Sequence, residues 1–335
     1  MKTYLYHLTF KAPIHFGSHG IGLEETTISL GSDSFCSALV NAFALMGQAE
    51  EVIDALNSAG RPDFVLSSLF PYSCAKPRSP VYLVPRPLCR PLFREEADGI
   101  RFAKKLKKRR WLEPDEASRW VSGKPLSHEQ AAALAEDVEK RHGQWWVEDL
   151  RPRVALDRHS SNSSIWWCGT VVFKPHNGLY GLIHVTNEAW KDRLQQALAL
   201  LGEMGLGGER TYGMGEFEVG DFIPIEQIGG FTGFAESQNQ LLLSRYYPSM
   251  QERGLLDRHL LAWDMVESRG HIVSGRHATG IKRKRVRMLT EGCVAQRPLT
   301  GTMIDVTPDG ADELGLDHRV YRCGLGFWIG KGGAA

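Results

Sequence analysis

The clearest patterns of hydrophobic and polar positions lie in the first two thirds of the chain. Residues 2–10 alternate between apolar and polar types, which is the period of a half-buried β-strand. A helix is predicted next, with Ser32 or Asp33 as its cap and Gly47 at its end. Its apolar face is formed by Phe35, Leu39, Ala42, Phe43 and Met46.

Further strands are predicted at residues 64–66 and 81–84, and residues 151–173 fit a long hairpin. After a strand at 179–185, Asn187 caps a helix with a regular apolar stripe, and a strand at 213–219 closes the unit. The order strand, helix, strand, strand, helix, strand is the ferredoxin-like or RRM-like plan.

The chain is therefore expected to be α+β, with residues 1–222 forming one ferredoxin-like domain. Residues 85–150 are charged and irregular, which indicates an insertion; within it a capping box at Ser127 and Gln130 begins a helix through Lys140. Residues 223–335 are expected to form a second, degenerate ferredoxin-like domain.

Composition limits the possible chemistry. The 335 residues carry a formal net charge of +1, so a polyanionic partner must be met by local basic patches. The sequence has no signal-type segment and no apolar run of membrane-spanning length, so we expect a cytoplasmic protein without membrane contact. The six cysteines are scattered, and no metal, cofactor or nucleophile motif is predicted.

Three basic clusters favour contact with phosphate. Residues 101–111 hold seven positive charges and no acid, with aromatic residues at the ends, although a solvated charge run explains this cluster equally well. A second cluster lies on the predicted hairpin and a third on a predicted strand, where alternation places Lys282 opposite to Arg283 and Arg285. The candidate RNA contacts from these clusters are Lys104, Lys105, Lys108, Arg109, Arg151, Arg153, Arg158, Lys282, Arg283 and Arg285.

Residues 205–215, here called the glycine loop, contain five glycines and one arginine between a predicted helix and a predicted strand. The loop is neither a P-loop nor a dinucleotide fingerprint, because its helix precedes the glycines. It either presents bare N–H groups to an anion or forms a helix end followed by a bulged strand. Its candidate contact residues are Gly205, Gly207, Gly208, Arg210, Tyr212, Gly213 and Gly215.

Two histidines flank a glycine near the end of the first strand. His15 and His19, beside Gly17, could serve as an acid/base pair for RNA cleavage, because imidazole titrates near neutral pH. A histidine at a glycine turn is more often a structural or ligand-contacting residue, and we expect that role here.

These features resemble a known family. The glycine loop is similar to that of the RAMP superfamily of CRISPR proteins. The stretches around His15-Phe16-Gly17, Leu66-Ser67-Ser68-Leu69-Phe70, Val84-Pro85-Arg86-Pro87 and Met288-Leu289-Thr290-Glu291-Gly292 resemble the fourth Csm subunit of type III-A interference complexes. The similarity covers nearly the whole chain in the same order.

The resemblance implies two ferredoxin-like domains with a projecting β-hairpin thumb at about residues 151–173. It implies a non-catalytic subunit that takes part in antiviral defence and binds the repeat-derived 5′ handle of crRNA. The implied protein partners are the large polymerase/cyclase-like subunit and the backbone RAMP subunit, with target RNA met indirectly. His15, Gly17, His19, Arg86 and the glycine loop are then expected to contact the handle, with Arg210 on a phosphate.

Two alternatives remain open at this stage. A repeat-processing RAMP endoribonuclease shares the loop and the fold, but its loop usually lies near the C-terminus. A general single-stranded RNA-binding module is predicted by the basic clusters alone.

Overall fold

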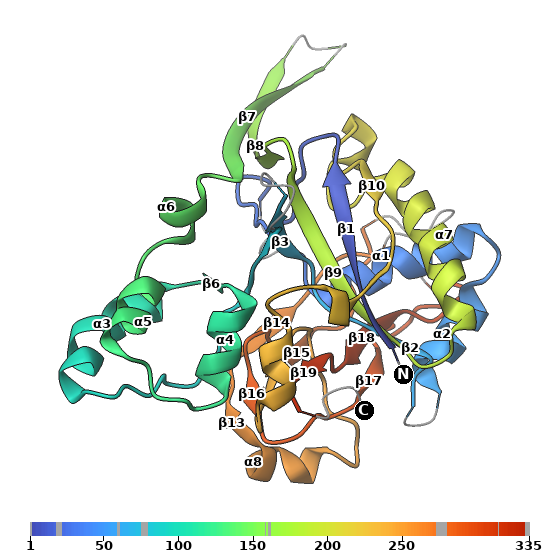
Figure 1. The fold of residues 1–335 in the computed structure, drawn as a ribbon. Helices are drawn as coiled ribbons and strands as arrows, with labels where there is room; N and C mark the ends of the chain where they lie inside the picture. The colour runs from blue at the N-terminus through green and yellow to red at the C-terminus, as the bar shows by residue number, and fades with distance from the viewer. Residues whose placement is uncertain are drawn as a thin grey trace.

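The computed structural model describes residues 2–17, 22–58, 61–74, 80–157, 159, 162–272, 280–313 and 315–331. Helices and strands alternate along the first half of the chain, and short strands dominate the last third (Figure 1). The α+β class predicted from sequence is confirmed. None of the described helices has the length and apolar character that crossing a bilayer requires.

A seven-stranded antiparallel sheet organises the molecule. Its main path runs β10-β1-β9-β3-β4, while β11 pairs with β1 and β2 pairs with β9. The strands are β1 (Lys2–Phe10), β2 (Phe64–Leu66), β3 (Phe70–Ser73), β4 (Val81–Tyr82), β9 (Asn177–Val185), β10 (Phe217–Val219) and β11 (Ile223–Pro224). Strand β1 thus lies inside the sheet, with β10 and β11 along one edge and β9 along the other.

Three helices pack on one face of this sheet: α1 (Ser32–Leu45), α2 (Ala49–Asn57) and α7 (Ala189–Met204) (Figure 1). Their apolar sides bury Phe35 and Leu198, and the ring of Phe35 stacks on that of Tyr6. Gly47 has φ of 75° just after α1 ends, as expected for a helix terminator. Asn187 accepts a hydrogen bond from the Ala189 N–H at the start of α7.

The predicted cap of α1 was wrong. Gly31 occupies the N-cap position, and Ser32 and Asp33 lie buried in the first turn. Their side chains are used elsewhere: the Ser32 hydroxyl accepts a hydrogen bond from the Arg245 N–H, and Asp33 pairs with Arg322. Both side chains therefore bind residues distant in sequence and do not cap the helix.

The prediction of a half-buried β1 was also wrong, because both faces of the strand are covered. On the face away from α1, Tyr180 packs against Phe231, and the His184 ring stacks on Phe327 with centroids 3.9 Å apart. The residues that cover this face come from the chain after β11. On that face Thr3 is buried and hydrogen-bonded to His184, and only Thr9, near the end of the strand, is exposed.

The insertion is folded rather than irregular. It contains α3 (Glu96–Lys108), α4 (Pro114–Val121), α5 (His128–Leu134) and α6 (Val138–His142), and the short pair β5 (Val84–Pro85) and β6 (Trp111–Leu112) joins it to the sheet. The capping box at Ser127 and Gln130 is confirmed. The helix that begins there, α5, ends at Leu134, and residues 138–142 form the separate helix α6. The predicted extension of one helix to Lys140 was therefore wrong.

A long hairpin leaves the sheet next, and its predicted presence is confirmed. It consists of β7 (Trp146–Leu156) and β8 (Ser163–Phe173), which project from the body at the top of Figure 1. Since β8 leads directly toward β9, the base of the hairpin is fixed to the central sheet.

The chain after β11 folds into small sheets. They contain β12 (Gln240–Leu242), β13 (Leu260–Ala262), β14 (Met265–Ser268), β15 (Val286–Leu289), β16 (Val294–Ala295), β17 (Gly301–Asp305), β18 (Tyr321–Leu325) and β19 (Trp328–Ile329). Four of these strands form one sheet in the order β13-β16-β12-β19. Within the described part of this region, the only α-helix is α8 (Leu256–His259), and the second ferredoxin-like domain stays a prediction.

A buried ion pair joins the seven-stranded sheet unit to the chain after β11, here called the C-terminal half. The carboxylate of Asp33, in the first turn of α1, accepts hydrogen bonds from Arg322 on β18 and from the Ser268 hydroxyl on β14. Burial opposes ionisation of Asp33, but the charges of Arg322 and Arg245 outweigh it and hold the pKa of the carboxyl below its usual value. The side chains of Asp33 and Arg322 are only 6% and 2% exposed.

We expect Arg322→Met to destabilise the protein by about 3–5 kcal/mol, because it leaves a buried carboxylate without its partner. The double variant Asp33→Asn/Arg322→Met removes both charges and should recover much of this loss. Urea unfolding of the two variants measures the difference. Equal stabilities of the single and double variants would contradict the role of the pair.

Candidate nucleic-acid interface

The inner side of the glycine loop packs on the segment that follows β1. The Gly208 N–H donates to the His15 carbonyl and the Gly215 N–H donates to the Pro13 carbonyl, both at 2.9 Å. Within the loop, the Leu206 N–H donates to the Gly215 carbonyl at 2.9 Å. These N–H groups are thus used inside the protein.

The same packing explains several of the glycines. A Cβ at Gly207, where φ is 101°, would lie 2.6 Å from the His15 carbonyl oxygen. A Cβ at Gly215, where φ is 82°, would lie 2.2 Å from the Leu206 carbonyl oxygen, and one at Gly205 would lie 2.6 Å from the Met214 carbonyl oxygen. Of the two readings of the loop, close backbone packing accounts for its inner side.

The outer side of the loop is different. Residues Arg210–Tyr212 form a single 3₁₀ turn, η1, bounded by Glu209 and Gly213 in the left-handed region. The Tyr212 side chain is 61% exposed, and the Arg153 guanidinium of β7 lies 4.7 Å from the centre of its ring. The structure therefore brings the hairpin cluster and the glycine loop together at one surface.

His15 connects the hairpin to the glycine loop, because its side chain contacts β8 and its carbonyl accepts from Gly208. It is buried, and its Nδ1 lies 2.7 Å from the Gly169 carbonyl oxygen of β8, so Nδ1 carries the proton and donates it to that carbonyl. The neighbouring Gly17 pairs with Thr26 in an isolated bridge. His19 lies outside the described residues. This geometry supports a structural role for His15.

The charges at the junction are mixed. Arg151 is paired with Asp149 at 3.0 Å, its side chain 42% exposed. Burial raises the pKa of the Cys168 thiol, Glu209 raises it further, and Arg153 and Arg151 act in the opposite direction. These groups therefore lie within electrostatic reach of one another. Arg158 lies outside the described residues.

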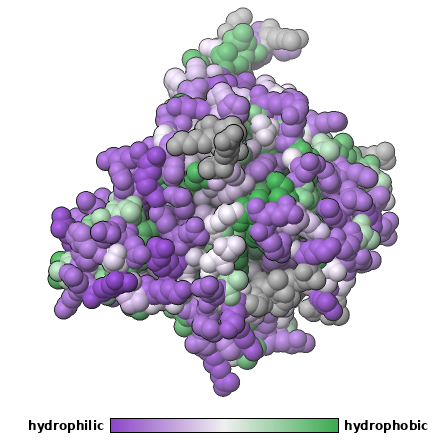
Figure 2. All heavy atoms as spheres, in the orientation of Figure 1, coloured by the Kyte–Doolittle hydropathy of each residue, from purple (hydrophilic) through white to green (hydrophobic). Residues whose placement is uncertain are grey.

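One face of the hairpin is apolar and exposed. Opposite residues of an antiparallel pair share a face, and the register pairs Pro152 with Trp167 and Val154 with Ile165. The large exposed side chains of this face are Leu150, Val154, Leu156, Ile165 and Trp167, between 43% and 70% exposed. Figure 2 shows green apolar atoms on the projecting hairpin. Such a patch on a projecting element marks a surface for a partner.

The basic residues of the run 101–111 differ in their exposure to solvent. Lys104 and Lys105 are exposed on α3, which buries Phe102 and Leu106 and lies far from the hairpin in Figure 1. Arg109 is buried, donates to the Leu134 carbonyl and pairs with Asp137. Its contacts favour a structural role, and the exposed lysines form a solvated helix face.

The third cluster does not lie on a regular strand, since β15 begins only at Val286, and the predicted alternation was wrong. Lys282 pairs with His271 through the backbone in an isolated antiparallel β-bridge. The Arg285 side chain is 72% exposed, and its Nη1 lies 4.0 Å from Oε1 of Glu267. Burial and the nearby Arg322 lower the pKa of Arg283 to about 10. The charged partners of this cluster are Glu267, Asp309 and the Asp33–Arg322 pair, none of which belongs to the hairpin or the glycine loop.

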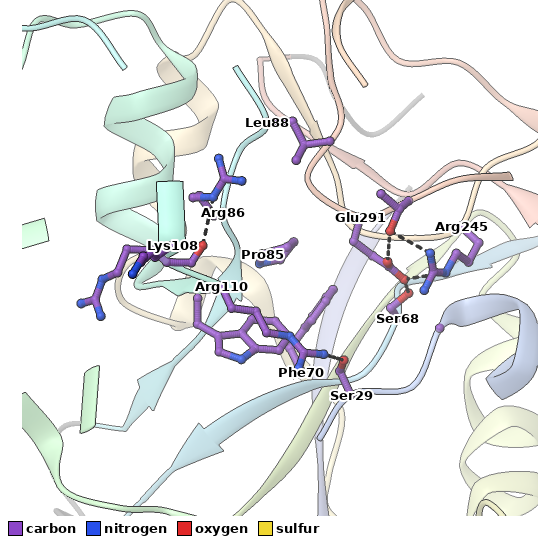
Figure 3. Close-up of a pocket in the computed structure, with 14 residues that line it drawn as sticks. Ser29, Ser68, Phe70, Pro85, Arg86, Leu88, Lys108, Arg110, Arg245 and Glu291 are labelled. Atoms are coloured by element: carbon purple, nitrogen blue, oxygen red, sulfur yellow. Dashed lines mark hydrogen bonds and ion pairs between the residues drawn. The ribbon is translucent and has the colours of Figure 1, made fainter. Parts of the chain in front are cut away.

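A cavity of about 370 Å³ lies where the sheet, the insertion and the C-terminal half meet (Figure 3). The residues that line it are Ser29, Gly31, Ser68, Phe70, Pro85, Arg86, Leu88, Lys108, Arg109, Arg110, Trp111, Arg245, Thr290 and Glu291. Among them Arg86, Lys108 and Arg109 were candidates from sequence, whereas Arg110, Arg245 and Glu291 were not. Over the described part of the chain, no cluster of three potential metal-ligating side chains is present.

Comparisons with known proteins agree with one another. A family model, the CRISPR Csm4 C-terminal domain, matches residues 235–331. Csm4 of Thermococcus onnurineus is 27% identical over 314 residues, covering 89% of this chain and 90% of the relative. Csm4 of Mycobacterium tuberculosis is 28% identical over 312 residues, covering 92% and 91%.

Solved structures share the fold. A chain in the Csm1-Csm4 cassette in complex with cA4 matches with a TM-score of 0.59 and 22% identity, over 98% of each chain. A chain in the Csm3-Csm4 subcomplex of the type III-A interference complex matches with a TM-score of 0.57 and 16% identity, over 98% of this chain and 99% of that one. Together with the family model, these matches confirm the resemblance to the fourth Csm subunit.

Two glycines of the loop make a matched pair for testing its inner packing. Gly207→Ala should cost about 2 kcal/mol or more, because the new Cβ meets backbone in a left-handed conformation. Gly213 has φ of 78° but open space around a Cβ, so Gly213→Ala should cost only about 1 kcal/mol. Thermal or urea unfolding gives both values, and a larger loss at Gly213 would argue against the packing.

Proposed function

Given that the chain is a Csm4-like protein, we propose that it serves as a non-catalytic subunit of a type III-A CRISPR (Csm) effector complex. In that complex it holds the repeat-derived 5′ handle of crRNA and takes part in cytoplasmic defence against foreign RNA and DNA. The observation that supports this best is the meeting of the hairpin and the outer side of the glycine loop, at Arg153 and Tyr212.

This surface suits single-stranded RNA. Arginine side chains on a hairpin and an adjoining turn can contact successive phosphates, while an exposed tyrosine can stack on an unpaired base. The inward use of the loop's N–H groups means that side chains, chiefly Arg210 and Arg153, carry the contact. A nearly neutral protein would in this way bind a polyanion through a local patch.

The finer fold assignment is part of the proposal. The antiparallel order β10-β1-β9-β3, with α1 and α7 as the connecting helices, supports a ferredoxin-like first domain at residues 1–222. The hairpin β7–β8 serves as its thumb. The region 223–335 is proposed as the degenerate second domain, with β-strands packed over the second face of the first.

Protein partners follow from the exposed apolar face of the hairpin. We assign this face to contact with a neighbouring subunit, because five large exposed apolar side chains from β7 and β8 share one face of the projecting hairpin. In similar solved structures, Csm4 is in complex with Csm1 or with Csm3. We propose that the chain likewise links a large cyclase-like subunit to the backbone RAMP subunits, and meets target RNA through them.

The endoribonuclease alternative is less well supported. His15 is buried and its Nδ1 is engaged with a backbone carbonyl, so the imidazole is poorly placed to take a proton from a solvent-exposed ribose. Incubating the purified protein with labelled repeat RNA tests this point. Metal-independent cleavage that is lost in His15→Ala would replace the scaffold proposal with the nuclease.

Charge reversal tests the RNA surface. Arg210→Glu should weaken binding of a repeat-derived handle about tenfold or more, because it removes a charged phosphate contact. Arg61 is exposed and lies outside the glycine loop and the hairpin, so Arg61→Glu is the matched control and should change affinity little. Fluorescence anisotropy at one fixed salt concentration measures both.

A scrambled RNA of equal length completes the comparison. Tighter binding of the handle supports a handle-specific subunit, and equal binding would favour a general single-stranded RNA-binding module. Similar losses from Arg210→Glu and Arg61→Glu would leave the glycine loop with a purely structural role.

A further inference from the structure

We propose that the cavity in Figure 3 is a nucleotide site, which binds one nucleotide unit by its phosphate and its base. The inference rests on the proposed function where the nucleotide belongs to the bound RNA strand. A free nucleotide offers the same chemistry, and the experiment below separates the two sources.

The cavity is formed by parts of the chain that are distant in sequence. Ser29, Ser68 and Phe70 come from the sheet unit, Arg86 and Arg110 from the insertion, and Arg245 and Glu291 from the C-terminal half. Its volume of about 370 Å³ is more than an inorganic phosphate needs. It falls in the range of roughly 300–1,000 Å³ that is typical of small-molecule sites.

Its charges favour an anion. In the described part of the chain, Arg86, Lys108 and Arg110 line the cavity without forming an ion pair, whereas Glu291 is the single acid of the lining and is already paired with Arg245 at 3.2 Å. Arg86 is partly buried, and burial lowers the pKa of its guanidinium, whereas Lys108 and Arg110 are exposed and open to a ligand. Lining cations whose side chains form no ion pair are suited to a phosphate.

Backbone contacts hold these cations in place. The β5–β6 pair sets Pro85 opposite Trp111, and the Arg86 N–H donates to the Arg110 carbonyl at 3.0 Å. The Arg86 Nε donates to the Arg109 carbonyl at 2.9 Å, and Arg110 Nη2 donates to the Ser29 hydroxyl at 3.1 Å. In Figure 3, Arg86 and Lys108 face Arg245 and Glu291 across the cavity, with Pro85 and Arg110 between them.

The apolar part of the lining favours a base. The Arg110 guanidinium lies 5.0 Å from the centre of the Trp111 ring, and that ring meets Phe70 edge-on at 6.0 Å. A guanidinium stacked on an indole offers a flat, positive platform on which an unpaired base stacks. Leu88 and Pro85 add apolar surface beside it. A phosphate alone would leave this part of the lining unused.

Hydrogen bonds connect one wall of the cavity to the segment beside the glycine loop. Phe16, beside the glycine loop, accepts a hydrogen bond through its carbonyl from the Thr27 N–H at 2.9 Å. The Thr27 hydroxyl in turn donates to the Ser29 carbonyl at 2.8 Å, and Ser29 lines the cavity. Glu148, at the base of the hairpin, acts electrostatically on Arg110. One wall of the cavity is thus linked by hydrogen bonds to the segment that packs on the glycine loop.

The test uses the full-length chain with two probes, a repeat-derived handle RNA and AMP. Arg110→Gln and Lys108→Gln remove cavity cations whose side chains are exposed, so both variants should keep the wild-type unfolding temperature. Lys107→Gln is the matched control, because Lys107 is an exposed lysine of the same helix that does not line the cavity. Fluorescence anisotropy follows the RNA, and calorimetry follows AMP.

We expect Arg110→Gln to weaken handle binding about tenfold and Lys108→Gln to weaken it less, with Lys107→Gln unchanged. Loss confined to the RNA assigns the site to a nucleotide of the strand, and loss confined to AMP assigns it to a free nucleotide. If neither probe responds to Arg110→Gln, the nucleotide site is overturned.

The two proposals fail in different ways. An unchanged Arg110→Gln beside a weakened Arg210→Glu removes the cavity site and leaves handle binding intact. Absence of handle binding by the wild-type chain removes the proposed function, and AMP binding that depends on Arg110 would still support the cavity as a nucleotide site.

Discussion

A buried carboxylate, that of Asp33 in the first turn of α1, sets the relation between the two halves of the molecule. A charge removed from water must find compensation inside the protein, and here the compensating groups come from β18 and β14. The adjacent Ser32 hydroxyl accepts from the Arg245 N–H, and the Ser32 N–H donates to the Ser68 hydroxyl, which in turn donates to Glu291. The first turn of one helix thus positions the charged residues on one side of the cavity.

The glycine loop serves two purposes on its two sides. On the inner side, glycines let the backbone approach residues 13–16 closely, and this contact fixes the loop against the base of the hairpin. On the outer side, the turn that carries Arg210 and Tyr212 is left exposed beside Arg153. Of the two interpretations open at the level of sequence, the inward use of these N–H groups favours close backbone packing, and it leaves any anion contact to the side chains of the turn. A rigid inner contact allows flexible outer side chains to be presented at a defined place.

Sequence was sufficient where local pattern decides the structure. The alternation of residues 2–10, the stripe of α7 and the capping box of α5 each reflect contacts close along the chain, and all three elements begin where expected, although α5 ends earlier than predicted. Pattern failed where distant residues decide. Nothing near Ser32 or Asp33 indicates that Arg245 and Arg322 occupy their side chains, and nothing near β1 shows that its second face will be covered.

The same division applies to the candidate site. A run of seven positive charges indicates polyanion contact, but only the fold separates the exposed Lys104 from the buried Arg109 and from the cavity residue Arg110. The cavity has a further consequence for how the chain matures. Its walls join residues near position 30 to residues near position 290, so it closes only after contacts of very high sequence separation have formed. A chain that is truncated, or still being synthesised, lacks the cavity even if its first sheet is folded. A ligand of the cavity selects the finished subunit and, by mass action, adds to its stability.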